Sequence, residues 1–132
     1  MKALLSVDDL LLSYLTAFES SDITAIDQLF EANALIEVPM LKPNRLVGKP
    51  EIHQGHSDMF ASLESIKFEV KRCLADDKQA IAEASATVVR RDTDSYSLQL
   101  GIVAIKGQQE LQRLSLYCDA RNLRLWSDRT IL

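Results

Sequence analysis

One histidine lies where a helix could bury it and give it a chemical role. His56 recurs with Ile52, Met59, Phe60 and Leu63 at spacings of four, three, one and three, which places all five on one side of a helix. An imidazole titrates near neutrality, so His56 could shuttle a proton if it met a carboxylate such as Asp119. It could equally be a hydrogen-bonded core residue.

The last predicted strand, residues 110–119, carries a row of polar side chains. Because neighbouring residues of a strand point to opposite faces, the polar residues share one face and the apolar residues share the other. The polar face holds Arg113, Ser115, Tyr117 and Asp119, and the other face holds Leu114, Leu116 and Cys118. Simple patterning buries the leucine face and leaves the polar face in water.

Nothing in the sequence favours a metal or a cofactor. His53 and His56 are three residues apart, which permits joint coordination on a helix, but Glu51 lies off their face and no third ligand is evident. Cys73 and Cys118 are too few and too distant for a metal knuckle, and we expect reduced thiols. The sequence therefore predicts no metal and no cofactor.

Composition indicates one globular domain, residues 1–132, with 47% apolar and 26% charged residues. The net charge of −4 argues against nucleic acid, whose phosphates require a concentrated basic surface. The leucine-rich start, residues 1–15, is interrupted by Asp8 and Asp9, so we expect no signal peptide and no membrane insertion. These features predict a cytoplasmic protein.

The elements that would position these residues change in period along the chain. The sequence predicts one helix capped by Ser6, a second from Asp22 to about Asn33, and a third with Pro50 in its first turn. From Ser65 the period falls from about 3.6 to 2. The predicted strands are residues 34–38, 45–47, 65–74, 79–91, 95–106 and 110–119. This order predicts an α+β fold in which helices cover a curved antiparallel sheet.

Five segments in this order resemble the nuclear transport factor 2-like superfamily, which includes ketosteroid isomerases and SnoaL-like polyketide cyclases. They read Ser-Tyr-Leu-Thr-Ala-Phe-Glu-Ser-Ser-Asp at 13–22, Leu-Phe-Glu-Ala-Asn-Ala at 29–34, Ile-Glu-Val-Pro at 36–39, Val-Gly-Lys-Pro-Glu-Ile at 47–52 and Tyr-Cys-Asp at 117–119. The resemblance implies a cone-shaped α+β barrel, a sheet wrapped around a pocket, and a homodimer formed through the outer sheet face.

The resemblance to ketosteroid isomerases assigns roles to three positions. Tyr14 matches the oxyanion-holding tyrosine, Val38 stands where the base is expected, and Gly101 stands near the place of the acid. Val38 cannot move a proton, so that reaction is not expected unless the register shifts and Glu37 points inward. Tyr14 could also be a buried helix residue with no further role.

The cyclase-like branch implies an acid/base aspartate near the end of the last long strand, where Asp119 stands. The histidine expected on the preceding strand is missing, since residues 102–105 are Ile-Val-Ala-Ile. Asp119 could instead end the strand as a turn or cap residue. The resemblance also favours placing the polar face of the last strand in the pocket, with Arg113 as an anchor and the leucines outward beneath a partner subunit.

The sequence thus supports two hypotheses. In the first, the chain binds a small hydrophobic or oxygenated organic molecule and isomerises, cyclises or hydrates it by acid/base catalysis. Asp119, Tyr14 and His56 would be catalytic, and Arg113, Tyr117, Ser115, Val38 and Phe60 would contact the substrate. In the second, the same residues only line the pocket of a non-catalytic dimeric binding or accessory domain, and a subunit of a larger complex is a further alternative.

Overall fold

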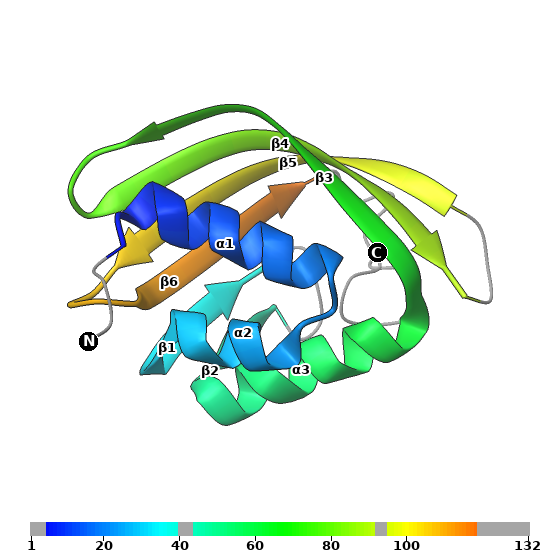
Figure 1. The fold of residues 1–132 in the computed structure, drawn as a ribbon, viewed down its shortest axis with the longest axis horizontal. Helices are drawn as coiled ribbons and strands as arrows, with labels where there is room; N and C mark the ends of the chain where they lie inside the picture. The colour runs from blue at the N-terminus through cyan, green and yellow to red at the C-terminus, as the bar shows by residue number, and fades with distance from the viewer. Residues whose placement is uncertain (1–4, 40–43, 92–94, 119–132) are drawn as a thin grey trace.

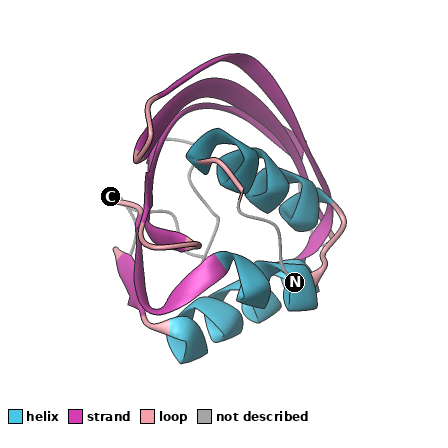
Figure 2. Ribbon diagram, turned by 60° about the vertical axis from the view of Figure 1, so that its left-hand side comes forward, coloured by secondary structure: helices cyan, strands magenta, loops and turns pink. Residues whose placement is uncertain are grey.

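The computed structural model describes residues 5–39, 44–91 and 95–118, which form helices packed against one curved sheet. The helices are Val7–Glu19 (α1), Ile23–Leu29 (α2) and Lys49–Ser62 (α3). The strands are Phe30–Glu37 (β1), Arg45–Val47 (β2), Leu63–Ala75 (β3), Gln79–Arg90 (β4), Ser95–Lys106 (β5) and Leu111–Cys118 (β6). The sheet arches over α1, while α2 and α3 lie on the open side of the arch (Figures 1 and 2).

Short polar side chains start the first two helices, as the sequence predicts. The Ser6 hydroxyl accepts a hydrogen bond from the Asp9 amide at 3.4 Å, and the Asp22 carboxylate accepts one from the Ala25 amide at 3.1 Å. Each satisfies an amide that the helix itself leaves without a partner. Pro50 stands in the first turn of α3, where its missing amide hydrogen costs nothing.

The second helix is shorter than predicted. It ends at Leu29, because Phe30 adopts an extended backbone with φ −114° and ψ 145° and begins β1. The spacing of Ile26, Leu29 and Phe30 suits a longer helical stripe, but all three are also buried when the chain turns into a strand. Tertiary packing has decided between two structures that the local pattern allows.

The predicted antiparallel meander from β3 to β6 is confirmed, but β1 adds a parallel pair to the sheet. The strand order is β2-β1-β6-β5-β4-β3, and every pair is antiparallel except β1 with β6, which is parallel. The sheet is therefore mixed and does not close into a complete barrel. Asp76 fixes the first meander turn by accepting from the amides of Lys78 and Gln79, which hold the pKa of its carboxyl below the usual value.

Small side chains on β4 make room for α1. The inner face of this strand is a row of alanines, Ala80, Ala82, Ala84 and Ala86, all buried. Because an alanine extends little above the sheet, α1 can lie close to β3, β4 and β5.

Among the described residues, no helix combines the length and apolar character needed to cross a membrane.

Candidate functional site

A hydrogen-bonded pair lies at the centre of the molecule. The Tyr14 hydroxyl on α1 is 2.8 Å from Nε2 of His56 on α3, and both side chains are completely buried. The other ring nitrogen, Nδ1, lies 2.7 Å from the carbonyl oxygen of Ile52, one turn earlier on α3. The prediction that His56 faces the core is confirmed.

These two contacts assign the proton positions. A carbonyl oxygen can only accept, so Nδ1 of His56 carries the ring proton and donates it to Ile52. In a neutral ring Nε2 is then the acceptor, and the Tyr14 hydroxyl donates to it. The two nitrogens of the neutral ring thus have different roles.

Burial holds the pair neutral. It lowers the pKa of His56 to about 4, an effect only partly opposed by the Ile52 carbonyl and the distant Asp27 carboxylate. Burial also raises the pKa of Tyr14 well above its ordinary value of 10.0. Proton transfer from Tyr14 to His56 is consequently unfavourable.

Aromatic rings surround the pair. Phe18 and Phe30 meet the Tyr14 ring edge-on, each with ring centroids 5.8 Å apart. Phe60, predicted to line the site, contacts Phe18 at 5.7 Å and His56 at 6.1 Å. The structure thus brings together three residues that the sequence singled out, Tyr14, His56 and Phe60.

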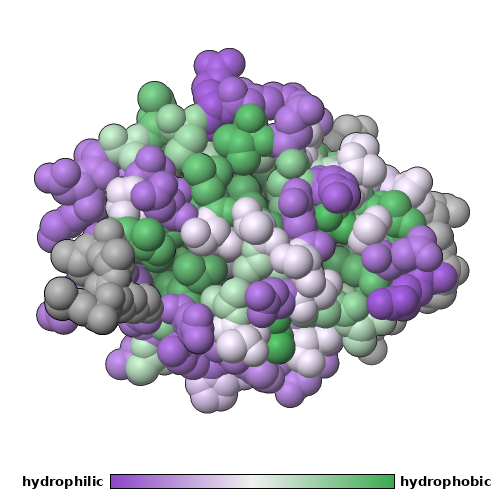
Figure 3. Space-filling view, in the orientation of Figure 1, coloured by the Kyte–Doolittle hydropathy of each residue, from purple (hydrophilic) through white to green (hydrophobic). Residues whose placement is uncertain are grey.

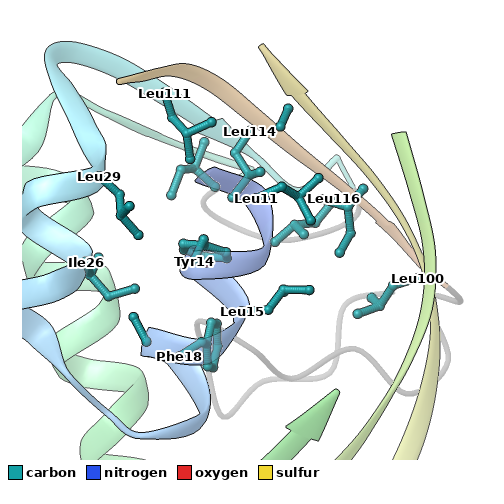
Figure 4. Close-up of a cluster of buried hydrophobic side chains, with 14 of the residues drawn as sticks. Leu11, Tyr14, Leu15, Phe18, Ile26, Leu29, Leu100, Leu111, Leu114 and Leu116 are labelled. Carbon is teal, nitrogen blue, oxygen red and sulfur yellow. The ribbon is translucent and has the colours of Figure 1, made fainter. Parts of the chain in front are cut away.

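An apolar cavity lies beside Tyr14, between α1 and the concave face of the sheet. Its lining consists of Tyr14, Leu15, Phe18, Ile66, Phe68, Ala86, Leu98, Leu100 and Leu116. Figure 4 shows several of these side chains around the Tyr14 ring. The cavity is small: the volume open to the centre of a water molecule is only about 10 Å³, which is enough for about one water molecule. A larger ligand would have to displace the walls.

Two larger hollows lie on the surface between α1 and α2. They share Leu5, Ser13 and Ala25, and on the same measure they hold about 180 and 410 Å³. Figure 3, drawn in the orientation of Figure 1, shows apolar patches separated by hydrophilic side chains on this face of the molecule. These hollows are open to solvent and lie away from the Tyr14–His56 pair.

The expected orientation of the last strand is wrong. Leu114 and Leu116 on β6 are buried in the core and pair across the sheet with Ala104 and Ile102, which also point inward. The alternation of apolar and polar residues alone therefore predicts the inner and outer faces of β6 correctly. The physical reason is that the inner face must supply apolar surface to cover α1, and the leucines provide it.

The polar residues of β6 consequently lie on the outer face. Arg113 donates to the Glu37 carboxylate on β1, and the Ser115 hydroxyl donates to the same carboxylate oxygen at 3.4 Å. Tyr117 is 50% exposed. The structure brings Arg113 and Ser115 together, but it separates them and Tyr117 from Tyr14 and His56 by the thickness of the sheet.

The register near residue 38 is also settled. Val38 is buried in the core, whereas Glu37 lies on the outer face opposite Ser115. Gly101 pairs with Tyr117 and so also faces outward. Neither position places a carboxylate in the interior, and the described residues therefore lack the base and the acid of a ketosteroid isomerase at these places.

Asp119 lies outside the described residues. His53 lies on the surface, where its Nδ1 is 2.9 Å from the Asp27 carboxylate of α2. Within residues 5–39, 44–91 and 95–118, no three His, Cys, Asp or Glu side chains come close enough together to hold a metal ion.

Sequence reasoning missed two charged residues. Glu37 was considered only as a replacement base, and its ion pair with Arg113 depends on the parallel contact of β1 with β6. Arg90 was not singled out, yet it is only 5% exposed. The alternation of β4 could have indicated its burial, because the even-numbered residues of this strand point inward and Arg90 is one of them.

Comparison with known proteins identifies the family. The SnoaL-like domain family matches residues 11–105. The chain belongs to this family. No curated protein matches the chain.

Solved structures show the same nuclear transport factor 2-like fold at low sequence identity. An LEH-like epoxide hydrolase from M. tuberculosis has a TM-score of 0.74 and 14% identity, covering 84% of this chain and 80% of its own. An NTF2-like protein of unknown function from Burkholderia pseudomallei has a TM-score of 0.78 and 12% identity, covering 90% and 95%. A ketosteroid isomerase-like protein from Erwinia carotovora atroseptica has a TM-score of 0.66 and 17% identity, covering 85% and 92%. At these identities the likeness establishes the fold alone.

Proposed function

We propose that this SnoaL-like protein binds a small hydrophobic molecule with an oxygen function in the cavity beside Tyr14 and acts on it by acid/base chemistry. The observation that carries the proposal is the apolar cavity, part of whose wall is Tyr14, the residue whose hydroxyl is hydrogen-bonded to the buried His56. An apolar pocket with a few convergent polar groups is the usual form of a small-molecule site. The solved epoxide hydrolase with this fold is compatible with such chemistry.

Each candidate group has a distinct part in this proposal. The Tyr14 hydroxyl contacts the oxygen function of the ligand, and His56 receives or returns the proton through Tyr14. Asp119, which directly follows β6 in the sequence, supplies a carboxylate acid or base. The reaction is an isomerisation, cyclisation or hydration, and it requires no cofactor.

The small cavity makes opening part of the proposal. Its free space of about 10 Å³ is far below the several hundred Å³ of a typical ligand site, so binding must move wall side chains. Phe68 is the half-buried member of the wall and lies against Phe18, with centroids 5.4 Å apart. Shortening Phe68 should therefore ease entry.

A thermal-unfolding screen tests binding. Wild-type protein would be heated with steroids, polyketide-like aromatics, terpenoid epoxides and small keto acids, and a ligand at 100 times its Kd should add about 2.7 kcal/mol. Phe68→Leu should enlarge the shift for a bulky ligand, whereas Phe30→Leu, a buried ring outside the cavity lining, should not. If no compound shifts the unfolding midpoint of any variant, the binding proposal is wrong.

A second candidate function is non-catalytic binding. It is favoured by the pair itself, whose contacts satisfy Tyr14 and His56 internally and whose pKa shifts oppose proton transfer. Turnover of the bound compound that is lost in Tyr14→Phe or Asp119→Asn, with folding retained, supports the enzyme. Binding without turnover supports the accessory domain.

We also propose that the protein forms a homodimer through the outer face of the sheet. This face exposes Leu74, Ile81 and Tyr117, each at least half accessible to solvent in the single chain. These residues replace the leucines of β6 as the surface that a second subunit would cover. The proposal includes neither nucleic acid nor a membrane as a partner.

A further inference from the structure

We propose that residues 65–70 of the edge strand β3 form a gate to the apolar cavity beside Tyr14, and that the Glu19 carboxylate is the latch that holds this gate closed against α1. The inference rests on the proposed binding in that cavity. An apolar ligand enters between α1 and β3, and its affinity depends on a residue that lies outside the cavity lining.

The wall of the cavity is least enclosed at Phe68. Of the described residues that line the cavity, Phe68 is half-buried, and the others are all buried. The Phe68 ring rests against Phe18 of α1, with ring centroids 5.4 Å apart. We therefore place the entrance between α1 and β3, at this ring.

β3 is also the strand of the wall that can move most easily. It lies at the edge of the sheet and pairs only with β4, whereas β4, β5 and β6 each pair on both sides. Its register against β4 shifts between residues 63 and 65 and again between residues 70 and 72. Because such irregularities bend a strand and interrupt its ladder, the segment between them, which carries Phe68, can lift away from α1.

Glu19 holds this segment in place. It is the last residue of α1, and its Oε2 atom accepts a hydrogen bond from the Phe68 amide at 2.6 Å. A hydrogen bond to a carboxylate is stronger than one between neutral groups. Glu19 is exposed and does not line the cavity, so replacing it changes the latch and leaves the lining as it is.

A bound ligand and a closed latch exclude each other. The free volume of about 10 Å³ holds about one water molecule, so even benzene must displace the wall, and Phe68 is its least restrained member. A ligand that binds only the open form binds more tightly when the closed form is destabilised. The net strength of one hydrogen bond corresponds to about a tenfold change in an equilibrium constant.

Benzene tests the gate, because an apolar cavity binds it without a polar partner. In calorimetric titrations, Glu19→Ala should bind benzene about tenfold more tightly than wild type. Glu19→Gln keeps an oxygen that can accept from the Phe68 amide, so its affinity should stay close to that of wild type.

Glu51→Ala is the matched control. The Glu51 carboxylate accepts a hydrogen bond from the Val47 amide at 2.9 Å, and Val47 belongs to β2, the strand at the other edge of the sheet. Neither residue lines the cavity. Glu51→Ala therefore removes the same kind of contact at the wrong edge, and it should leave the affinity for benzene unchanged.

The outcomes separate the gate from the proposed binding. Equal affinity of wild type and Glu19→Ala for benzene would overturn the gate and leave the binding intact. An equal gain in Glu51→Ala would show a general loosening of the fold and would also overturn it. If wild type, Glu19→Ala and Phe68→Leu all fail to bind benzene, and no compound of the wider screen shifts the unfolding midpoint, the proposed binding is refuted together with the gate.

Discussion

At the scale of single residues, His56 is unusual because a titratable ring occupies the centre of an aromatic cluster. α3 places it against Tyr14, and the backbone of the same helix fixes its tautomer through Ile52. Burial disfavours the charged ring and lowers the pKa of His56. Stability should therefore depend on keeping His56 unprotonated.

We predict that the protein loses stability between pH 6.5 and pH 4 through His56. Its pKa falls from 6.5 to about 4 on folding, so the unfolded chain binds a proton in this range that the folded chain does not. The contribution is fully present above pH 6.5 and decreases as the pH falls, by on the order of 3 kcal/mol. Denaturant unfolding at a series of pH values measures it.

His56→Leu should lack this part of the pH dependence, and His53→Leu, which changes the exposed histidine, should retain it. The prediction is wrong if the free energy of unfolding of His56→Leu falls as steeply as that of wild type.

We predict that Tyr14→Phe destabilises the fold by about 1–3 kcal/mol, because it removes the donor to the buried Nε2. The ring and its contacts with Phe18 and Phe30 remain. A double-mutant cycle with His56→Leu, measured by urea unfolding, should give a coupling energy of about 0.5–3 kcal/mol. Additive effects would show that the hydrogen bond contributes nothing to stability.

At the scale of elements, β2 is held against α3 by a close approach at a glycine. A Cβ placed on Gly55 would lie 2.6 Å from one methyl carbon of Leu46 and 3.2 Å from the other. Leu46 is the buried residue of the short strand β2. Glycine is a poor helix former, but its missing side chain leaves room for Leu46 and lets β2 lie close to α3.

We predict that the effect of Gly55→Ala on the free energy of unfolding changes sign when Leu46 is replaced by alanine. In wild type it should destabilise, because the contact with Leu46 outweighs the gain of up to about 1 kcal/mol in helix propensity. In a Leu46→Ala background the same substitution should stabilise. Thermal unfolding of the four proteins measures this, and a stabilising effect in both backgrounds would contradict the proposed contact.

The elements that were predicted well are those whose signals are local. The caps Ser6 and Asp22, the strand 45–47 and the strand 95–106 each depend on a few neighbouring residues, and the structure confirms them. The end of α2 depended instead on packing around Phe30. Local pattern alone does not fix such a boundary.

The candidate site was predictable only in part, for the same reason. Helical spacing placed His56 in the core, but its contact with Tyr14 joins residues 42 positions apart and has no local signal. The faces of β6 were misassigned because the resemblance was given more weight than the alternation of Leu114 and Leu116 with polar residues. The burial of those leucines follows from their contact with the rest of the core.

At the scale of the whole molecule, the outer sheet face is the surface through which we propose that the protein forms a dimer. We predict that Ile81→Glu converts a dimer into a monomer, because Ile81 is 56% exposed on β4, beside the edge strand β3, and a carboxylate there would be buried by a second subunit. Sedimentation equilibrium measures the mass.

Leu12→Glu is the matched control, since Leu12 is an exposed leucine on α1, at 39%, on the opposite side of the sheet. It should leave the mass unchanged. A monomeric wild type, or equal dissociation by both substitutions, would refute the outer-face dimer.

The position of β1 between β2 and β6 has a consequence for how the chain folds. β1 can pair with β2 early in synthesis, but its other edge pairs with β6, where Glu37 meets Ser115, 78 residues later. Contacts between such distant segments slow folding, because a long loop must close before they form. Until β6 leaves the ribosome, β1 presents an open strand edge, and aggregation during synthesis should start there.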